Sequence, residues 1–192
     1  MKNTITNYLN DIIHLCETLD TDALERTCQV LLDAYKNKKH IFVAGNGGSA
    51  GTVNHFSCDF SKNAVKSQID RPKVISLSSN IEVVTALGND FCYGDVFLEQ
   101  LKNLMNDGDV IILVSASGNS ENVVKAAEYV HSRNGQVISF TGFSGGKLKD
   151  LSDVNLNIPC DSYEESEDIH MIIMHLIVCC FKSMKLGEGY NA

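Results

Sequence analysis

Short apolar runs alternate with helical patterns from residue 40 onward, and this alternation constrains the fold more than any other feature of the sequence. The apolar runs predict five β-strands, at 40–44, 73–77, 109–114, 136–141 and 154–158. Apolar residues at helical spacing predict helices at 49–60, 81–87, 93–105, 120–133 and 166–184. Strands that are separated by helices form a parallel sheet with helices on both faces, so the sequence predicts an α/β fold. The run at 109–114 is the most apolar, which predicts a central strand buried on both faces.

The first 38 residues precede this alternation and predict two helices. Their apolar residues recur at helical spacing, and the residues 20–22 interrupt the pattern. Asp22 is a candidate cap for the second helix, because Glu25 follows it in the capping-box position. We interpret residues 1–38 as a helical hairpin that serves packing or oligomerisation. The rest of the chain, 39–192, has no linker and no internal repeat, so we expect residues 1–192 to form one domain.

Charge and cysteine content argue against several classes of protein. A formal net charge of −8, without basic clusters, disfavours general binding of nucleic acid or of an anionic membrane. The seven cysteines are scattered and form no C-x-x-C pair, which argues against a cysteine zinc site and against a secreted disulfide framework. The first residues lack a signal-peptide pattern, and the longest apolar run, 171–181, is too short to span a bilayer. We therefore expect a protein of the reducing cytoplasm that binds neither nucleic acid nor membrane.

Two strand-to-helix loops have the composition of anion-binding sites. The first predicted strand leads into Gly45-Asn46-Gly47-Gly48-Ser49, which lacks the spacing of a Walker loop or of a dinucleotide fingerprint. Its glycines let the backbone approach a ligand closely. The central strand leads into Ser115-Ala116-Ser117-Gly118-Asn119-Ser120, which joins three hydroxyls to a helix N-terminus. Each loop alone is also compatible with a tight turn, and Ser120 with a simple N-cap. Together, at one edge of a parallel sheet, they predict a phosphate-binding site.

Four titratable residues on two predicted helices are candidates for acid–base or metal chemistry. His55 and Asp59 are four residues apart and share one helix face. Glu167 and His175 lie on one row of the last helix, and His175 falls inside an apolar stretch. Such residues can bind a metal or divide acid–base work, but the first pair is also typical of a surface contact, and a buried histidine of a core. His170 lies about 140° around the helix from His175, so the two histidines cannot face one site.

Three segments carry a resemblance to a known family. They are GNGGSAGTVNHF at 45–56, LGNDF at 87–91 and SASGNSENV at 115–123. Together they resemble a sugar isomerase (SIS) domain, and the sequence is most similar to the phosphoheptose isomerases. The resemblance covers essentially the whole chain. It implies an SIS-type three-layer sandwich with a five-stranded parallel sheet, helices on both faces and the N-terminal helical hairpin.

The resemblance also implies which residues form the site. The residues that it assigns to the phosphosugar are Asn46, Gly47, Gly48, Ser49, Asn89, Asp90, Ser115, Ala116, Ser117 and Ser120. It implies one zinc ion per site, held by His55, Asp59, Glu167 and His175. The family has Glu where this chain has Asp59, and Gln where it has Glu167, so the reach of one predicted ligand and the charge of another differ. Relatives are homotetramers whose sites combine neighbouring subunits, which implies a homotetramer here.

The implied reaction is an aldose–ketose isomerisation through an enediol. It would convert sedoheptulose 7-phosphate into D-glycero-D-manno-heptose 7-phosphate, a precursor of heptose in lipopolysaccharide, capsule or another glycan. In this interpretation Asp59 is the base, His175 is the partner acid/base, and the metal polarises the substrate oxygens. Two alternatives stay open: an isomerase of another ketose phosphate, favoured by the changes at Asp59 and Glu167, and a non-catalytic SIS module that binds a phosphosugar or a protein partner.

Overall fold

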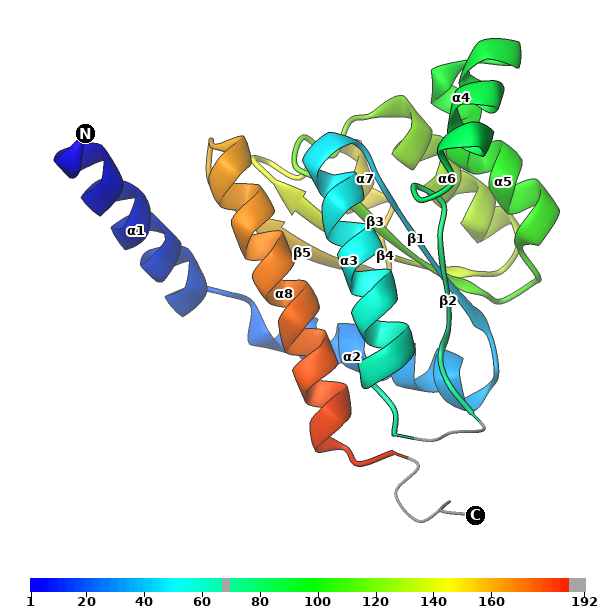
Figure 1. The fold of residues 1–192 in the computed structure, drawn as a ribbon, viewed down its shortest axis with the longest axis horizontal. Helices are drawn as coiled ribbons and strands as arrows, with labels where there is room; N and C mark the ends of the chain where they lie inside the picture. Colours follow the sequence, from blue (N-terminus) through cyan, green and yellow to red (C-terminus); the bar gives the residue numbers. More distant parts are fainter. Residues whose placement is uncertain (67–69, 187–192) are drawn as a thin grey trace.

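A computed structural model describes residues 1–66 and 70–186, and a five-stranded parallel sheet forms its centre (Figure 1). The strands are β1 His40–Gly45, β2 Lys73–Ser76, β3 Val110–Ser115, β4 Gln136–Gly142 and β5 Val154–Ile158. The helices are α1 Lys2–Glu17, α2 Thr21–Lys36, α3 Gly47–Asn63, α4 Ile81–Asp90, the 3₁₀ turn η1 Tyr93–Asp95, α5 Val96–Leu104, α6 Glu121–Ser132, α7 Gly146–Asp150 and α8 Tyr163–Ser183. Every predicted strand and helix is present, and the short helix α7 is an element that the sequence analysis did not predict.

The strand order places the two candidate loops side by side. The sheet runs β2-β1-β3-β4-β5, and all neighbouring strands are parallel. The six residues of β3 are all buried, which confirms the prediction of a central strand. In the pairing of β1 with β3, Gly45 lies opposite Val114, so both strands end at the same edge of the sheet. The loops that follow β1 and β3 therefore meet there.

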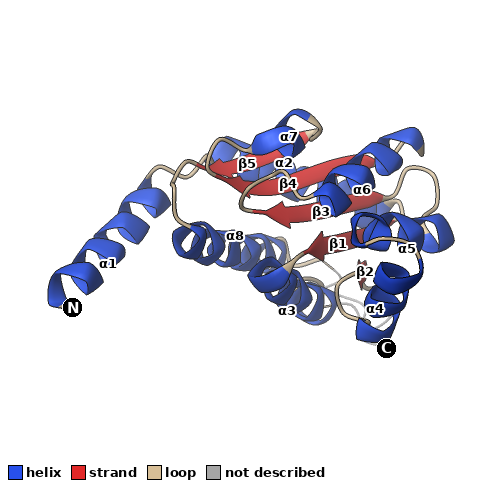
Figure 2. Cartoon of the chain, turned by 90° about the horizontal axis from the view of Figure 1, so that it is seen from above, coloured by secondary structure: helices blue, strands red, loops and turns tan. Residues whose placement is uncertain are grey.

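Helices cover both faces of the sheet, which confirms the three-layer α/β sandwich (Figure 2). The helices α2, α3 and α8 pack on one face, and α5 and α6 pack on the other. In β1, Ile41 and Val43 point into the first layer, whereas Phe42 and Ala44 point into the second. Because side chains alternate along a strand, a strand with two buried faces needs apolar residues at every position. This requirement explains the continuous apolar runs of the sequence. Within the described ranges, no helix has the length and apolar character needed to cross a bilayer.

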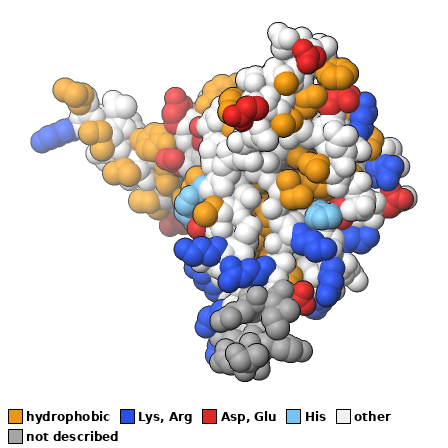
Figure 3. All heavy atoms as spheres, turned by 45° about the vertical axis from the view of Figure 1, so that its right-hand side comes forward, with side chains coloured by type: hydrophobic (Ala, Val, Ile, Leu, Met, Phe, Trp, Pro, Cys, Tyr) orange, Lys and Arg blue, Asp and Glu red, His pale blue; other side chains and the backbone are white. Residues whose placement is uncertain are grey.

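The two N-terminal helices form where the sequence predicts them, but α1 does not fold back along α2. It projects from the body of the molecule (Figure 1). Its contacts are with the start of α8, where the Tyr8 hydroxyl donates to Asp168 at 2.7 Å. Hydrophobic side chains gather along this projecting helix (Figure 3). Ile5, Leu9 and Ile13 are 60%, 56% and 57% exposed, because α1 has few neighbours to cover them. The helix thus presents an uncovered apolar stripe.

The predicted cap of the second helix is wrong by two residues. Helix α2 begins at Thr21, and the carboxylate of Asp20 accepts the backbone N–H of Ala23 at 2.8 Å. Asp22 therefore lies inside the first turn, where a carboxylate is favourable to the helix dipole but does not cap the helix.

Candidate functional site

A cavity of about 180 Å³ opens at the edge of the sheet where β1 and β3 end. It is lined by Asn46, Ser49, Val114, Ser115, Ala116, Ser117, Ser120, Tyr163 and Glu167. Six of the ten residues that we expected to contact a phosphosugar are among these. The cavity therefore unites the glycine loop after β1 with the serine loop after β3, at the position that the strand order dictates.

The serine loop has the features of an anion cradle. Ser120 occupies the N-cap position of α6, yet its side chain makes no capping hydrogen bond. Ser120 therefore does not act as the simple side-chain N-cap that the sequence also allowed, and its hydroxyl can donate to a ligand. The hydroxyls of Ser115 and Ser117 line the same cavity, and the N-terminus of α6 adds the positive end of its dipole. A phosphate group fits this combination of hydroxyl donors and backbone amides.

A neighbouring loop holds the serine loop in place. Gly118 has φ +61°, and a Cβ at this position would collide with the carbonyl oxygen of Gly145. A hydrogen bond also joins the end of β4 to the serine loop: the backbone N–H of Gly142 donates to the carbonyl of Ala116 at 2.8 Å. Only glycine combines this backbone conformation with so close an approach. The segment after β4 is therefore a rigid support of the cradle.

Glu167 reaches into the cavity from α8. Its carboxylate lies against Gly48, in the first turn of α3, so that a Cβ on Gly48 would collide with it. The N-cap residue of α3, Asn46, makes no side-chain capping bond. The carboxylate of Glu167 is therefore close to the positive end of the α3 dipole, an arrangement in which the dipole attracts a negative charge. Gly48 allows this contact but is not itself among the lining residues.

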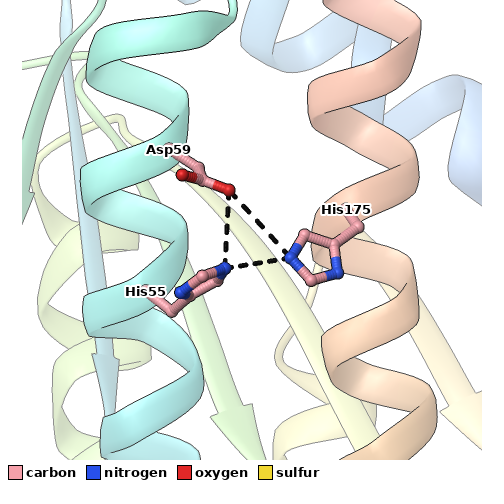
Figure 4. Close-up of side chains that lie close together, drawn as sticks. All are labelled: His55, Asp59 and His175. Carbon is pink, nitrogen blue, oxygen red and sulfur yellow. Dashed lines mark hydrogen bonds and ion pairs between the residues drawn. The ribbon is translucent and has the colours of Figure 1, made fainter.

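Three side chains on α3 and α8 converge outside the cavity (Figure 4). The Nε2 atoms of His55 and His175 are 2.9 Å apart. One carboxylate oxygen of Asp59 lies 3.4 Å from the His55 Nε2 and 4.0 Å from the His175 Nε2. The other oxygen of this carboxylate accepts a hydrogen bond from Asn63 at 3.3 Å. The three side chains are 46%, 28% and 50% exposed, in the order His55, Asp59, His175, so a small ligand can reach them. We call them the His/Asp/His group.

The donor set of this group suits a divalent metal ion. Two imidazole nitrogens and one carboxylate oxygen are ligands that zinc accepts, and a catalytic site leaves a fourth position open. Ligand atoms of a tetrahedral zinc site lie about 3.3 Å apart, given bonds of about 2.0–2.1 Å. The three distances in this group, 2.9, 3.4 and 4.0 Å, bracket that value. The residues present therefore fit a metal site.

The structure does not bring the fourth predicted ligand to this group. Glu167 precedes His175 by two full turns of α8, a rise of about 12 Å along the helix, and its carboxylate lies in the cavity. Of the described residues that line this cavity, none comes from α4: Asn89 and Asp90 are exposed at the end of that helix, where the Asn89 amide donates to the Asp90 carboxylate at 2.9 Å. These two residues do not contact the cavity of their own chain.

The two histidines of α8 have different surroundings, as their spacing predicts. His170 is fully buried against Phe140 in the face that packs on the sheet. Burial lowers the pKa of His170 to about 4, and neither of its ring nitrogens has a hydrogen-bond partner among the described residues. His170 is therefore a neutral core residue, whereas His175 faces α3.

Sequence reasoning missed Tyr163 as a residue of the cavity. Tyr163 is the first residue of α8 and lies four residues before Glu167, so both occupy the same row of the helix. The four-residue spacing from Glu167 would indicate Tyr163 as a cavity residue if the predicted helix began at 163 instead of 166.

Comparison with known proteins agrees with this geometry. Residues 6–142 match the family model of the SIS domain, the class of protein that this sheet and its serine loop define. A phosphoheptose isomerase of Helicobacter hepaticus is 35% identical over 171 residues, which cover 89% of this chain and 86% of that protein. Solved structures of phosphoheptose isomerases from Neisseria gonorrhoeae and Francisella tularensis align with TM-scores of 0.85 and 0.84, at 28% and 25% identity, over 95% of this chain and 96% of each of theirs. The chain belongs to the phosphoheptose isomerase family of SIS-domain proteins.

Proposed function

We propose that this chain is an isomerase that converts sedoheptulose 7-phosphate into D-glycero-D-manno-heptose 7-phosphate. The observation that carries the proposal is that α3 and α8 both begin at the serine-lined cavity and, further along, bring the His/Asp/His group together. A ketoheptose phosphorylated at its last carbon has its carbonyl near the opposite end of the chain. Such a substrate needs one site for the phosphate and a second, separate site for the reacting carbons, and this arrangement supplies both.

In this proposal the serine loop binds and the His/Asp/His group reacts. Ser115, Ser117 and Ser120 donate to the phosphate, together with backbone amides at the start of α6. Asp59 removes a proton from the carbon next to the carbonyl and returns it to the former carbonyl carbon. His175 moves a proton between the two oxygens, so that the ketose becomes an aldose with no net gain or loss of protons.

The proposed cofactor is one zinc ion per site, held by His55, Asp59 and His175. When bound, a zinc ion acts as a Lewis acid toward the substrate's carbonyl and hydroxyl oxygens. Glu167 as a fourth ligand stays a prediction, because its carboxylate lies in the cavity in the described conformation. The position of the Glu167 carboxylate in the cavity also favours a second candidate function, an isomerase of another ketose phosphate. A carboxylate beside the phosphate cradle changes which arrangement of sugar hydroxyls the cavity can accept.

We also propose that the chain assembles into a homotetramer in the cytoplasm, as a single domain over residues 1–192. The exposed apolar stripe of α1 supports assembly, because water disfavours it in an isolated chain. Asn89 and Asp90, which do not contact their own cavity, would then be available to the site of a neighbouring subunit. Seven free thiols are compatible with a reducing compartment.

Product analysis tests the proposed function. The purified protein is assayed for zinc and then incubated separately with sedoheptulose 7-phosphate, fructose 6-phosphate and ribulose 5-phosphate. We expect stoichiometric zinc and an aldoheptose 7-phosphate from the first substrate only. Turnover of another ketose phosphate alone would establish the second candidate. Binding of phosphosugars by a metal-free, inactive protein would replace the isomerase with a binding module.

A further inference from the structure

The side chain of Asn46 is held by a hydrogen-bond network that the proposed reaction does not use. Its Nδ2 donates to Oδ1 of Asn122 at 2.9 Å, and Nδ2 of Asn122 donates back to Oδ1 of Asn46 at 2.9 Å. The hydroxyl of Tyr93 donates to the same Asn46 oxygen at 2.9 Å. Three elements that are distant in the sequence, the start of α3, the start of α6 and η1, therefore meet at one carboxamide.

This network fixes the orientation of the Asn46 carboxamide. The oxygen accepts two hydrogen bonds, which uses both of its lone pairs, whereas the nitrogen spends only one of its two N–H groups on Asn122. Asn122 is 2% exposed, so leaving its amide without a partner would carry a desolvation cost. Turning the carboxamide around would break this pattern of donors and acceptors.

The network also separates two cavities. Beside the serine-lined cavity lies a second one of about 440 Å³, lined by Asn46, Tyr93, Gly94, Ser120, Glu121 and Asn122. Asn46 and Ser120 belong to both linings. A carboxamide released from Asn122 and Tyr93 would thus have room to turn away from the serine-lined cavity.

Tyr93 is itself firmly placed. The ammonium group of Lys125 bridges the carboxylates of Asp95 and Glu121, at 2.8 Å to each. Gly94 lies so close to the Glu121 carboxylate that a Cβ there would come within 3.0 Å of it. These contacts fasten η1 to the first turns of α6, so the Tyr93 hydroxyl approaches Asn46 from a fixed direction.

We infer that Tyr93 and Asn122 are positioning residues, which hold the Asn46 carboxamide so that its remaining N–H group donates to the sugar in the serine-lined cavity. The inference rests on the proposed function, which assigns Asn46 to the sugar. Neither residue needs to touch the substrate, because each acts through Asn46.

The test measures binding of sedoheptulose 7-phosphate and of inorganic phosphate by calorimetry. We expect Asn46→Ala and Asn122→Ala each to raise the Kd for the sugar phosphate about tenfold, and Tyr93→Phe about threefold, as one neutral hydrogen bond is lost or loosened. The Kd for inorganic phosphate stays the same, because the serine loop holds it. In an Asn46→Ala background, Asn122→Ala and Tyr93→Phe add no further effect. In steady-state kinetics, we expect each single variant to have a higher KM than the wild type and a kcat within about twofold of it.

Two matched controls separate positioning from general damage. Asn155→Ala removes an amide on the edge strand β5 that donates to Ser139 and Thr141 of β4, and Tyr129→Phe removes a hydroxyl from the α5/α6 layer. Both leave the Kd for sedoheptulose 7-phosphate unchanged. Because Tyr93 is 57% exposed, its Phe variant keeps the inference testable even if Asn122→Ala fails to fold.

The outcomes distinguish this inference from the proposed function. Effects of Asn122→Ala and Tyr93→Phe that persist in the Asn46→Ala background, or that equal those on inorganic phosphate, would overturn the inference. A wild type that binds sedoheptulose 7-phosphate without isomerising it would contradict the proposed function. The Kd of each variant relative to that of the wild type would still decide this inference. A wild type that does not bind the sugar phosphate would overturn both.

Discussion

The serine loop and the His/Asp/His group are built in opposite ways. The serine loop follows the buried central strand, and Ser115 and Ala116 are only 6% and 5% exposed. Backbone contacts with the next loop fix its shape. The His/Asp/His group consists of three side-chain ends on the outer faces of two helices, each at least 28% exposed. Backbone contacts thus fix the shape of the binding loop, whereas the position of the reacting group depends on three side chains on two helices, so mutations should separate binding from chemistry.

The largest expected effect comes from the reacting side chains. Asp59→Asn and His175→Gln should each lower kcat roughly 100- to 10,000-fold, because each removes a group that moves a proton in the transition state. The Kd for inorganic phosphate should not change, since the serine loop is intact. His131→Gln is the matched control, because His131 pairs with Asp153 far from the site. Near-wild-type turnover in both Asp59→Asn and His175→Gln would contradict the division of roles.

A change in the backbone of the serine loop should act on stability and on binding together. Gly118→Ala forces a side chain into φ +61° and against the carbonyl of Gly145, at a cost of about 3 kcal/mol in the free energy of unfolding. Gly51→Ala is the control, because nothing lies within 4 Å of a Cβ there and the helix gains propensity. Urea titrations of both variants measure the difference. Equal stabilities would show that the loop is not held as tightly as the contact implies.

Much of the serine loop could be predicted from the sequence, whereas the arrangement of side chains between helices could not. Apolar runs identify the strands, and parallel strands end at one edge, so the pattern predicts that the loops 45–49 and 115–120 meet; the family resemblance then assigns Asn46 and the serines to the phosphosugar. The convergence of His55 with His175 depends on how α3 packs on α8, and the helical row of α8 did not reveal that Glu167 points toward Gly48 instead. Packing angles and rotamers set such distances, and spacing in one helix does not contain them.

The same reason explains the other differences. The Asp20 cap and the Tyr93–Asn46–Asn122 network depend on side-chain hydrogen bonds, for which several neighbouring candidates exist in the sequence. The path of α1 depends on a few contacts with the start of α8, such as the hydrogen bond from Tyr8 to Asp168, and the spacing of residues within α1 does not contain them.

Buried His170 should make the free energy of unfolding depend on pH. The pKa of buried His170 is about 4 in the folded protein and about 6.5 when unfolded, so the unfolded state takes up its proton first as the pH falls. The contribution of His170 to stability is therefore complete above pH 6.5 and is lost on the way down to pH 4, by about 3 kcal/mol in all. His170→Leu should show a correspondingly smaller loss over this range in urea titrations. An identical pH dependence in variant and parent would mean that His170 is not buried as described.

Within the serine loop, a single hydroxyl should affect binding alone. Ser117→Ala should raise KM about tenfold and leave kcat within about twofold, provided that the bond is equal in ground and transition states. Steady-state kinetics with sedoheptulose 7-phosphate measures both constants. An unchanged KM in Ser115→Ala, Ser117→Ala and Ser120→Ala alike would remove the phosphate from this loop.

The smallest effect on activity is expected at Glu167, which lies between the two regions. If Glu167 turns to become a zinc ligand, Glu167→Gln loses one negative charge but keeps an oxygen donor, and zinc affinity should fall about tenfold while activity at saturating zinc survives. Zinc titration of the variant beside the parent measures this. Equal affinities would assign Glu167 to the cavity alone.

The central claim is that the serine loop anchors a sugar phosphate whose carbonyl end is isomerised by the His/Asp/His group. Incorporation of solvent deuterium into sedoheptulose 7-phosphate, followed by NMR with saturating substrate, tests it most directly. The account predicts exchange at the carbon next to the carbonyl with the wild type, and exchange at least about 100-fold slower with Asp59→Asn at an unchanged Kd for inorganic phosphate. Bound substrate that exchanges no proton with the wild type, or that exchanges equally fast with Asp59→Asn, would contradict it.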